Sequence, residues 1–364
     1  MTHVMRRFAA AFIALLCLTD SAYCRADAAP AISASAYVLM DADSGRVLLA
    51  QNETAEKAIA STTKIMTALV ALRHSRLTDT VTVKREHLKA GSSMYLAEGE
   101  TLTMEALLYG LMLPSGNDAA ECIADFCGGG TAQFLTWMNE TAAELGMTHT
   151  AFANPSGLDQ QGHYSCALDM ARLMAEAMRE PTFAQIVSAK RATVGTRTMG
   201  NHNKLLGVVE GCIGGKTGYT DDAGRTLVTC AQRDGLRLIA VTLHDGSDWK
   251  DHTALYEYGF TTYRRADAVL RGRTYALCAV RGGEAPCVAL CAADGFACPL
   301  AVGEELTLRV ETLDAVRAPV AKGQVLGAVA VLLDGAEVGR VTLIAADAVR
   351  AAKAKQERPW WRRG

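Results

Sequence analysis

The sequence predicts a mixed α/β fold of the α+β type, in which helices flank an antiparallel sheet and a small β domain follows. Three features of the chain lead to this prediction. Two β-prone runs meet at a turn near the N-terminus, helical patterns fill the middle, and aliphatic strand candidates come late. Beyond the helical region, short strands interrupted by glycine take over. We therefore expect a large domain over residues 29–270 and a small β domain over residues 271–344.

The first expected element is a hairpin, because the β-prone runs Ala36–Ala42 and Arg46–Ala50 flank the turn Asp43–Gly45. From Ser61 to about Arg73, apolar residues occupy nearly every face, which is typical of a helix buried at the centre of a large domain. Further helical patterns run over residues 104–112, 117–126, 132–145, 167–179 and 250–264, and strand candidates over 225–230 and 237–243.

The small β domain rests on short aliphatic runs over residues 274–280, 306–310, 325–332 and 338–343. The last segment, residues 345–364, is a basic tail that contains Trp360 and Trp361. This composition is compatible with peripheral contact with an anionic membrane, although Pro359 interrupts any helix there.

Composition and charge are those of an ordinary globular protein. Of the 364 residues, 50% are hydrophobic and 21% are charged, and the formal net charge is −2. Because basic and acidic residues are interspersed, no nucleic-acid partner is predicted.

The N-terminus has the pattern of a secretory signal peptide. Arg6 and Arg7 precede the apolar run Phe8–Leu18, and small residues around Ala26–Ala28 offer a cleavage site. We expect residues 1–28 to be removed on export, which places the mature protein at the extracytoplasmic face of the cell membrane or in the cell wall.

The chain has 11 cysteines, of which Cys17 and Cys24 would leave with the signal peptide. An odd number remains, so they cannot all pair within one chain. The cluster Cys278–Cys298 is compatible with disulfides, a metal site or free thiols, and its spacing favours disulfides over a metal. No zinc-peptidase pattern such as H-E-x-x-H occurs, and we predict no metal and no other cofactor.

Three short motifs occur in order: Ser61–Lys64 (S-T-T-K), Ser115–Asn117 (S-G-N) and Lys216–Gly218 (K-T-G). One S-x-x-K alone is weak, since Ser247–Lys250 also matches it. The chain has no other S-x-N and no other K-T-G, so the ordered combination indicates a serine nucleophile with a lysine base.

The chemistry requires these residue types. Ser61 and Lys64 are three residues apart on one helical face, and a serine hydroxyl needs a base to become nucleophilic. Lys64 is a base only as a neutral amine, so its pKa must fall well below ~10.4. Burial and the second cation, Lys216, both act in that direction. Ser115 would relay the proton to the leaving amine, and Asn117 would hold Lys64 and a substrate amide.

The segments around these motifs, Ala60–Ala68, Leu111–Ala119, Asn154–Asp159 and Gly215–Thr220, resemble the low-molecular-weight penicillin-binding proteins. More closely, they are similar to the serine-type D-alanyl-D-alanine carboxypeptidases. The resemblance covers residues 30–270 and implies a penicillin-binding-protein/β-lactamase-like catalytic domain. It also implies two ligands, the stem peptide of peptidoglycan and β-lactam inhibitors.

By this resemblance Ser61 is the acylated nucleophile and Lys64 is its general base. Lys216 and Thr217 would receive the terminal carboxylate of the substrate, which extends beside Gly218. The backbone N–H groups of Ser61 and Tyr219 would form the oxyanion hole.

The chain departs from many relatives after the strand candidate 237–243, where an arginine near the carboxylate site is missing. Lys250 is a candidate substitute, although it offers a point charge and not a bidentate fork. We expect the charged run His244–His252 to be a solvated loop. Asn154–Gly157 is interpreted as a structural turn, and His163 and His202 are not assigned catalytic roles.

The predicted function is removal of the terminal D-alanine from stem pentapeptides. A D,D-endopeptidase stays open, because it shares the acyl-serine step. A β-lactamase or esterase on the same scaffold is the other alternative. A class A β-lactamase needs an additional glutamate, and no convincing segment of that kind follows Asn117.

Overall fold

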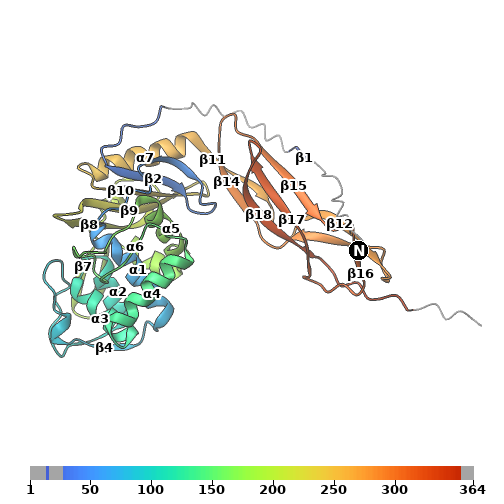
Figure 1. Cartoon of the computed structure of the whole chain (residues 1–364). Coiled ribbons are helices and arrows are strands. Elements are labelled where there is room, and N and C mark those ends of the chain that lie inside the picture. Colours follow the sequence, from blue (N-terminus) through green and yellow to red (C-terminus); the bar gives the residue numbers. More distant parts are fainter. Residues whose placement is uncertain (1–13, 16–27, 354–364) are drawn as a thin grey trace, which may run out of the picture. The chain divides into compact units, whose positions relative to one another are not determined.

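The computed structural model describes residues 14–15 and 28–353. Most of the predicted signal peptide, and the part of the tail that holds Trp360 and Trp361, lie outside these residues. The chain divides into two compact units, whose described residues are 28–264 for the first and 14–15 with 265–353 for the second (Figure 1). No helix in the described ranges is long and apolar enough to cross a membrane.

An antiparallel sheet in the order β3-β2-β10-β9-β8 forms the centre of the first unit. Its strands are β2 (Ala36–Asp41), β3 (Val47–Gln51), β8 (Cys212–Thr220), β9 (Gly224–Arg233) and β10 (Leu236–Leu243). The predicted hairpin is confirmed as β2 and β3, and the predicted strands 225–230 and 237–243 are β9 and β10. Strand β8 lies at the edge of this sheet.

Helices cover both faces of the sheet, with α7 on one face and the other helices on the opposite one (Figure 1). They are α1 (Lys64–His74), α2 (Met104–Met112), α3 (Asn117–Gly128), α4 (Thr131–Glu144), α5 (Ala167–Ala177), α6 (Pro181–Ser188) and α7 (Asp248–Thr262). The expected central helix is α1, which is buried from Lys64 to Ala71. The five other predicted helices are confirmed within a few residues. Helix α6 was not predicted, because an apolar pattern over only 8 residues does not distinguish a helix from a buried strand.

Small elements complete the first unit. They are the strand pairs β4 (Thr80–Thr82) with β5 (Thr101–Thr103) and β6 (Arg191–Val194) with β7 (Arg197–Gly200), and the 3-10 turns η1 (Ala60–Thr63), η2 (Arg85–His87) and η3 (Lys204–Gly207).

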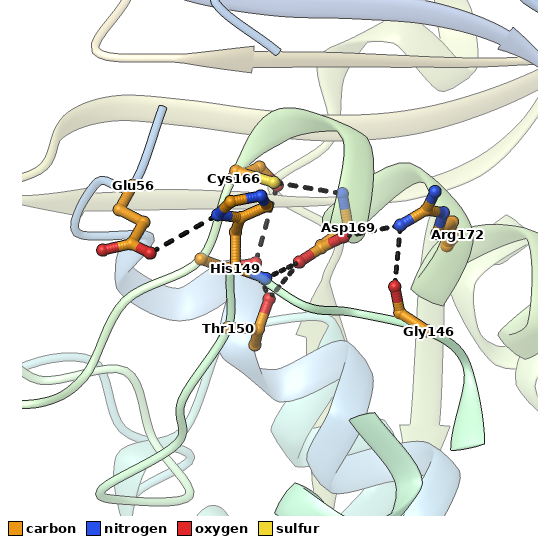
Figure 2. Close-up of polar contacts among 8 residues, drawn as sticks. Glu56, Gly146, His149, Thr150, Cys166, Asp169 and Arg172 are labelled. Atoms are coloured by element: carbon orange, nitrogen blue, oxygen red, sulfur yellow. Dashed lines mark hydrogen bonds and ion pairs between the residues drawn. The ribbon is translucent and has the colours of Figure 1, made fainter. Parts of the chain in front are cut away.

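A buried carboxylate fixes the start of α5. Asp169 is fully buried, and its Oδ2 accepts hydrogen bonds from the His149 backbone N–H at 2.8 Å and the Thr150 hydroxyl at 2.9 Å (Figure 2). Its Oδ1 accepts from Arg172 Nη1 at 3.0 Å. These donors satisfy the carboxylate and tie the loop that precedes it to the helix, so this cluster is structural.

The expectation of a solvated loop over His244–His252 is wrong. Asp245, Asp248, Asp251 and His252 are all buried, and α7 begins within this run. Asp251 accepts from the Ser33 hydroxyl at 2.7 Å, and His252 lies 2.7 Å from the Thr229 hydroxyl. Partners far away in the sequence therefore compensate for the burial of Asp251 and His252.

The second unit is a β domain with a seven-stranded sheet in the order β1-β15-β17-β18-β13-β12-β16. Its strands are β1 (Ala14–Leu15), β12 (Thr274–Arg281), β13 (Cys287–Ala292), β15 (Leu306–Thr312), β16 (Ala315–Arg317), β17 (Val325–Leu333) and β18 (Ala336–Ala345), and a separate pair joins β11 (Tyr263–Val269) to β14 (Phe296–Ala301). The four predicted strands are β12, β15, β17 and β18. The start of the expected tail belongs to this unit, because Val349 is buried in its core.

The favoured disulfides in the cysteine cluster are not present. Cys278, Cys287, Cys291 and Cys298 are free, as are the other cysteines among the described residues. Within the same residues, no group of three or more histidine, cysteine or acidic side chains could hold a metal ion. The buried ones, among them Cys278 and Cys298, act as small apolar side chains in the core, whereas Cys287 is exposed.

Candidate active site

Ser61 lies in the 3-10 turn η1, directly before α1 begins at Lys64. The turn opens with Ala60 at a φ of 47°, a left-handed conformation that is uncommon for a residue with a side chain. This geometry brings the Lys64 Nζ to 2.8 Å from the Ser61 Oγ. The nucleophile and base expected from the sequence are therefore in hydrogen-bond contact.

The Lys64 amine has two further partners. Its Nζ lies 2.8 Å from the Asn117 Oδ1 and 2.5 Å from the Ser156 carbonyl oxygen. The Asn117 amide nitrogen donates to the Ala90 carbonyl at 2.8 Å, so its oxygen faces Lys64. Both partners can only accept, and a neutral amine has two N–H groups and one lone pair. With both N–H groups engaged, the lone pair is left for the Ser61 hydroxyl.

The electrostatics favour the neutral form of Lys64. The side chain is fully buried, and burial holds the pKa of its amine well below the ordinary value, with the charge of Lys216 lowering it further. Asp118 and Glu121 act in the opposite direction but are smaller effects. In its neutral form, the Lys64 amine can accept a proton from a hydroxyl.

Ser115 is held in an unusual conformation before α3. The φ of Ser115 is 65°, and the residue is only 3% exposed. Its hydroxyl has no hydrogen-bond partner among the described residues. Gly116 N-caps α3, which begins at Asn117. A buried hydroxyl without a partner on a strained backbone is typical of a functional position.

The K-T-G motif lies on the edge strand β8. Lys216 is buried, its Nζ donates to the Thr217 carbonyl at 2.8 Å, and burial lowers its pKa to about 7. Gly218 lies against the nucleophile, because a Cβ there would be 3.0 Å from the Ser61 backbone nitrogen and 2.4 Å from the Thr226 Oγ1. Glycine is therefore needed for the close approach of β8 to η1.

The turn Asn154–Gly157 contributes a group that the sequence could not indicate. The Ser156 carbonyl accepts from Lys64, and the neighbouring Pro155 carbonyl accepts from the Thr67 hydroxyl at 2.6 Å. Any residue carries a backbone carbonyl, so no side-chain pattern marks this role. Through these two carbonyls the turn Asn154–Gly157 holds Lys64 and the start of α1 in place.

His163 supports the same region without being a proton acceptor for the reaction. Its Nδ1 accepts from the Ala153 backbone N–H at 3.1 Å, which leaves the Nε2–H to donate to the Thr63 hydroxyl at 2.7 Å. Burial lowers the pKa of His163 to about 4, so it stays neutral and holds η1 in place.

The remaining predicted residues lie on the other face of the edge strand. Side chains alternate along a strand, and Lys216 and Gly218 point toward η1, so Thr217 and Tyr219 point toward the α7 side. The Tyr219 side chain is exposed, and its hydroxyl lies 3.3 Å from the Asp221 Oδ1. Ser61, Lys64 and Asn117 thus form one hydrogen-bonded cluster, bordered by the motif on β8.

A second constellation has the residue types of a cysteine nucleophile with its base. Cys122 Sγ lies 3.1 Å from His87 Nδ1, and His87 Nε2 lies 3.2 Å from an Asp125 oxygen. However, the Lys84 backbone N–H donates to the same Nδ1 at 3.0 Å, and burial raises the pKa of the Cys122 thiol to about 12. A buried neutral thiol is not a nucleophile, so this cluster is structural.

Comparison with known proteins identifies the family. Residues 24–247 match the peptidase family S11, described as D-alanyl-D-alanine carboxypeptidase, and residues 267–351 match the C-terminal domain of penicillin-binding protein 5. The chain belongs to the D-alanyl-D-alanine carboxypeptidase family. It is therefore a serine-type peptidase and a penicillin-binding protein with a cell-wall function.

Two of the similar proteins match most of the chain, and a third matches about two thirds of it. The D-alanyl-D-alanine carboxypeptidase DacF of Bacillus subtilis is 30% identical over 89% of this chain and 88% of its own length. Penicillin-binding protein 5 of Haemophilus influenzae has a similar structure, with a TM-score of 0.78, 30% identity and coverage of 89% of this chain and 99% of its own. A variant of the Streptomyces K15 DD-transpeptidase matches with a TM-score of 0.62 and 33% identity, over 64% of this chain and 99% of its own.

Proposed function

We propose that the protein is a serine D,D-carboxypeptidase that removes the terminal D-alanine from peptidoglycan stem pentapeptides through an acyl-serine intermediate. This proposal rests on one observation, the hydrogen-bond contacts of the Lys64 amine. Two acceptor-only oxygens engage its N–H groups, and Ser61 lies on the remaining side. This is the arrangement that a neutral amine needs in order to take a proton from a hydroxyl.

In the proposed acylation, Lys64 takes the Ser61 proton while the Ser61 oxygen attacks the carbonyl between the two D-alanines. The backbone N–H groups of Ser61 and Tyr219 stabilise the oxyanion, a type of contact whose loss costs about 3 kcal/mol. Collapse of the tetrahedral species breaks the peptide bond. The proton passes from Lys64 through Ser115 to the leaving amine of D-alanine.

Water then attacks the acyl-serine, and Lys64 again accepts a proton, which returns to Ser61 as the ester breaks. Lys216 and Thr217 bind the terminal carboxylate of the substrate, and the stem peptide extends along the edge strand beside Gly218. A β-lactam would acylate Ser61 by the same first step. Because the substrate is part of the cell wall, we propose an exported protein that acts outside the cytoplasmic membrane.

The second candidate differs only in what attacks the acyl-serine. The match to a DD-transpeptidase favours an amine acceptor as an alternative to water. A D,D-endopeptidase differs in the leaving group, and a β-lactamase in the speed of deacylation after penicillin. All of them use Ser61.

The test is mass spectrometry of a purified muropeptide pentapeptide incubated with the protein. Wild-type protein is expected to release one alanine, and Ser61→Ala is expected to leave the substrate intact. Ser247→Ala is the matched control, because Ser247 belongs to the other S-x-x-K match and its side chain makes no capping hydrogen bond; this variant should keep full activity. Intact pentapeptide with wild-type protein would reject the proposal, and dimeric products would favour the transpeptidase.

A further inference from the structure

The carboxylate end of the substrate needs a cation that the chain does not supply at the position of the family arginine. Lys250 was the candidate from the sequence. It is exposed, and it lies off the buried stripe of α7 that contains Asp248, Asp251 and His252. The carboxylate site would therefore need another cation near Thr217.

Strand β9 presents its odd-numbered residues to α7. The Thr229 hydroxyl lies 2.7 Å from both the His252 Nδ1 and the Tyr256 hydroxyl, and both partners are on α7. The even-numbered Thr226 instead donates to the Ile59 carbonyl, beside η1. Arg225 therefore lies on the α7 face of the sheet, whereas its neighbour Thr226 faces Ile59.

The register of the two strands places Arg225 beside the K-T-G motif. Tyr219 is directly opposite Arg225, and Thr217 is opposite Leu227. Residues that are opposite each other in an antiparallel pair point to the same face, and diagonal neighbours are about 7–8 Å apart. Thr217, Tyr219 and Arg225 thus share one face at the edge of the sheet, within reach of a long side chain.

The guanidinium of Arg225 is held at one end and open at the other. Its Nη2 lies 2.7 Å from both carboxylate oxygens of Asp248, and its centre lies 5.5 Å from the Trp249 ring centroid. The Asp248 side chain is 3% exposed, whereas the Arg225 side chain is 43% exposed. Nη1 and Nε have no hydrogen-bond partner among the described residues, so donors remain for a second anion.

We propose that Arg225 is a specificity-determining residue that binds the terminal carboxylate of the substrate together with Thr217. Asp248 and Trp249 are positioning residues, which hold the guanidinium plane. This inference rests on the proposed carboxypeptidase function. Arginine is suited to the task because its planar fork matches a carboxylate. Its charge is also permanent, whereas the pKa of Lys216 of about 7 leaves that cation partly neutral at physiological pH.

The test compares two peptides, diacetyl-L-lysyl-D-alanyl-D-alanine and its C-terminal amide. Loss of one charge-assisted contact is expected to lower kcat/KM for the free acid about 10- to 100-fold in Arg225→Gln. For the amide, kcat/KM should be nearly unchanged. The ratio of kcat/KM for the free acid to kcat/KM for the amide should therefore fall by the same factor. Arg225→Lys should retain part of this ratio. Lys250→Gln is the matched control and should leave both values unchanged.

Removal of Arg225 alone leaves Asp248 buried without its partner, which is a separate perturbation. The double variant Arg225→Gln/Asp248→Asn removes both charges, and it should show the same loss of selectivity if Arg225 binds the carboxylate. An unchanged ratio in folded Arg225→Gln, or an equal loss for both peptides in the single and double variants, would overturn the inference. If wild-type protein cleaves neither peptide, the proposed function itself fails.

Discussion

The two units of the molecule bury different kinds of side chain. In the described residues, every buried polar or charged side chain lies between Asp41 and Thr262, in the first unit. The buried side chains of the β domain are apolar, and its charged residues lie at the surface. The two buried lysines of the candidate active site, Lys64 and Lys216, belong to the buried set of the first unit, and buried ionisable groups of this kind lower stability unless they are paired or retained for function.

Backbone strain has the same distribution. Among the described residues other than glycine with positive φ, only Asp334 lies in the β domain, whereas Ala60, directly before Ser61, and Ser115 of the S-G-N motif lie in the first unit. Asp334 is in the tight turn between β17 and β18, where such a conformation is common. Two of the strained residues of the first unit therefore belong to the candidate active site, and none of those in the β domain does.

The largest expected difference between the units comes from two alanine substitutions at crowded glycines. Gly218→Ala puts a Cβ 3.0 Å from the Ser61 nitrogen, which should displace β8 from the nucleophile and lower kcat/KM about 100-fold or more. Gly327→Ala puts a Cβ 2.5 Å from the Glu311 carbonyl, so it should destabilise the β domain and leave kcat/KM of the folded protein unchanged. Steady-state kinetics and thermal melts measure both effects. A similar loss of activity in both variants would contradict the proposed division.

The next largest effect is expected at Lys216 in the candidate active site, where burial of the amine lowers the stability of the folded protein. Burial lowers the pKa of Lys216 to about 7, so below its unfolded value of ~10.4 the unfolded chain binds the proton more readily than the folded protein. Lys216 therefore destabilises the fold, fully below pH 7 and progressively less as the pH rises toward 10. Lys216→Met should raise stability by about 1–3 kcal/mol at pH 6 and abolish activity.

The control for this prediction is Lys250→Met, at an exposed position on α7. Surface substitutions of this kind change stability by about 0.5 kcal/mol or less. Denaturant titrations at pH 6 and pH 10 separate the two variants. The idea fails if the gain for Lys216→Met is absent at pH 6 or larger at pH 10.

Some parts of the fold and of the candidate site could be predicted from the sequence, and others could not. The motif residues Ser61, Lys64 and Asn117 were predictable because the chemistry allows few residue types, and the structure brings them into contact. Ser156 was not, since its contribution is a backbone carbonyl. The sheet and the long helices followed from hydrophobic periodicity, whereas the apolar runs of α6 and β13 are too short to tell helix from strand.

The charged run before and within α7 was misjudged for a physical reason. Its acidic residues are compatible with burial only because Ser33 and Arg225 come from distant parts of the chain. Local composition gives no sign of such partners. The same long-range pairing hid Arg225 as a candidate, because a strand arginine with no motif around it resembles an ordinary surface residue.

The smallest expected effect is in the β domain, where charge is confined to the surface. Arg340 Nη1 lies 2.7 Å from a Glu311 oxygen, and its Nε lies 2.8 Å from a Glu337 oxygen, but these side chains are 36–44% exposed. Water and salt screen such pairs, so Arg340→Gln should lower stability by about 1 kcal/mol or less, and less still at high ionic strength. Activity should not change. A loss above about 2 kcal/mol that persists in high salt would mean that the β domain, like the first unit, depends on buried charge, and the contrast between the two units would no longer hold.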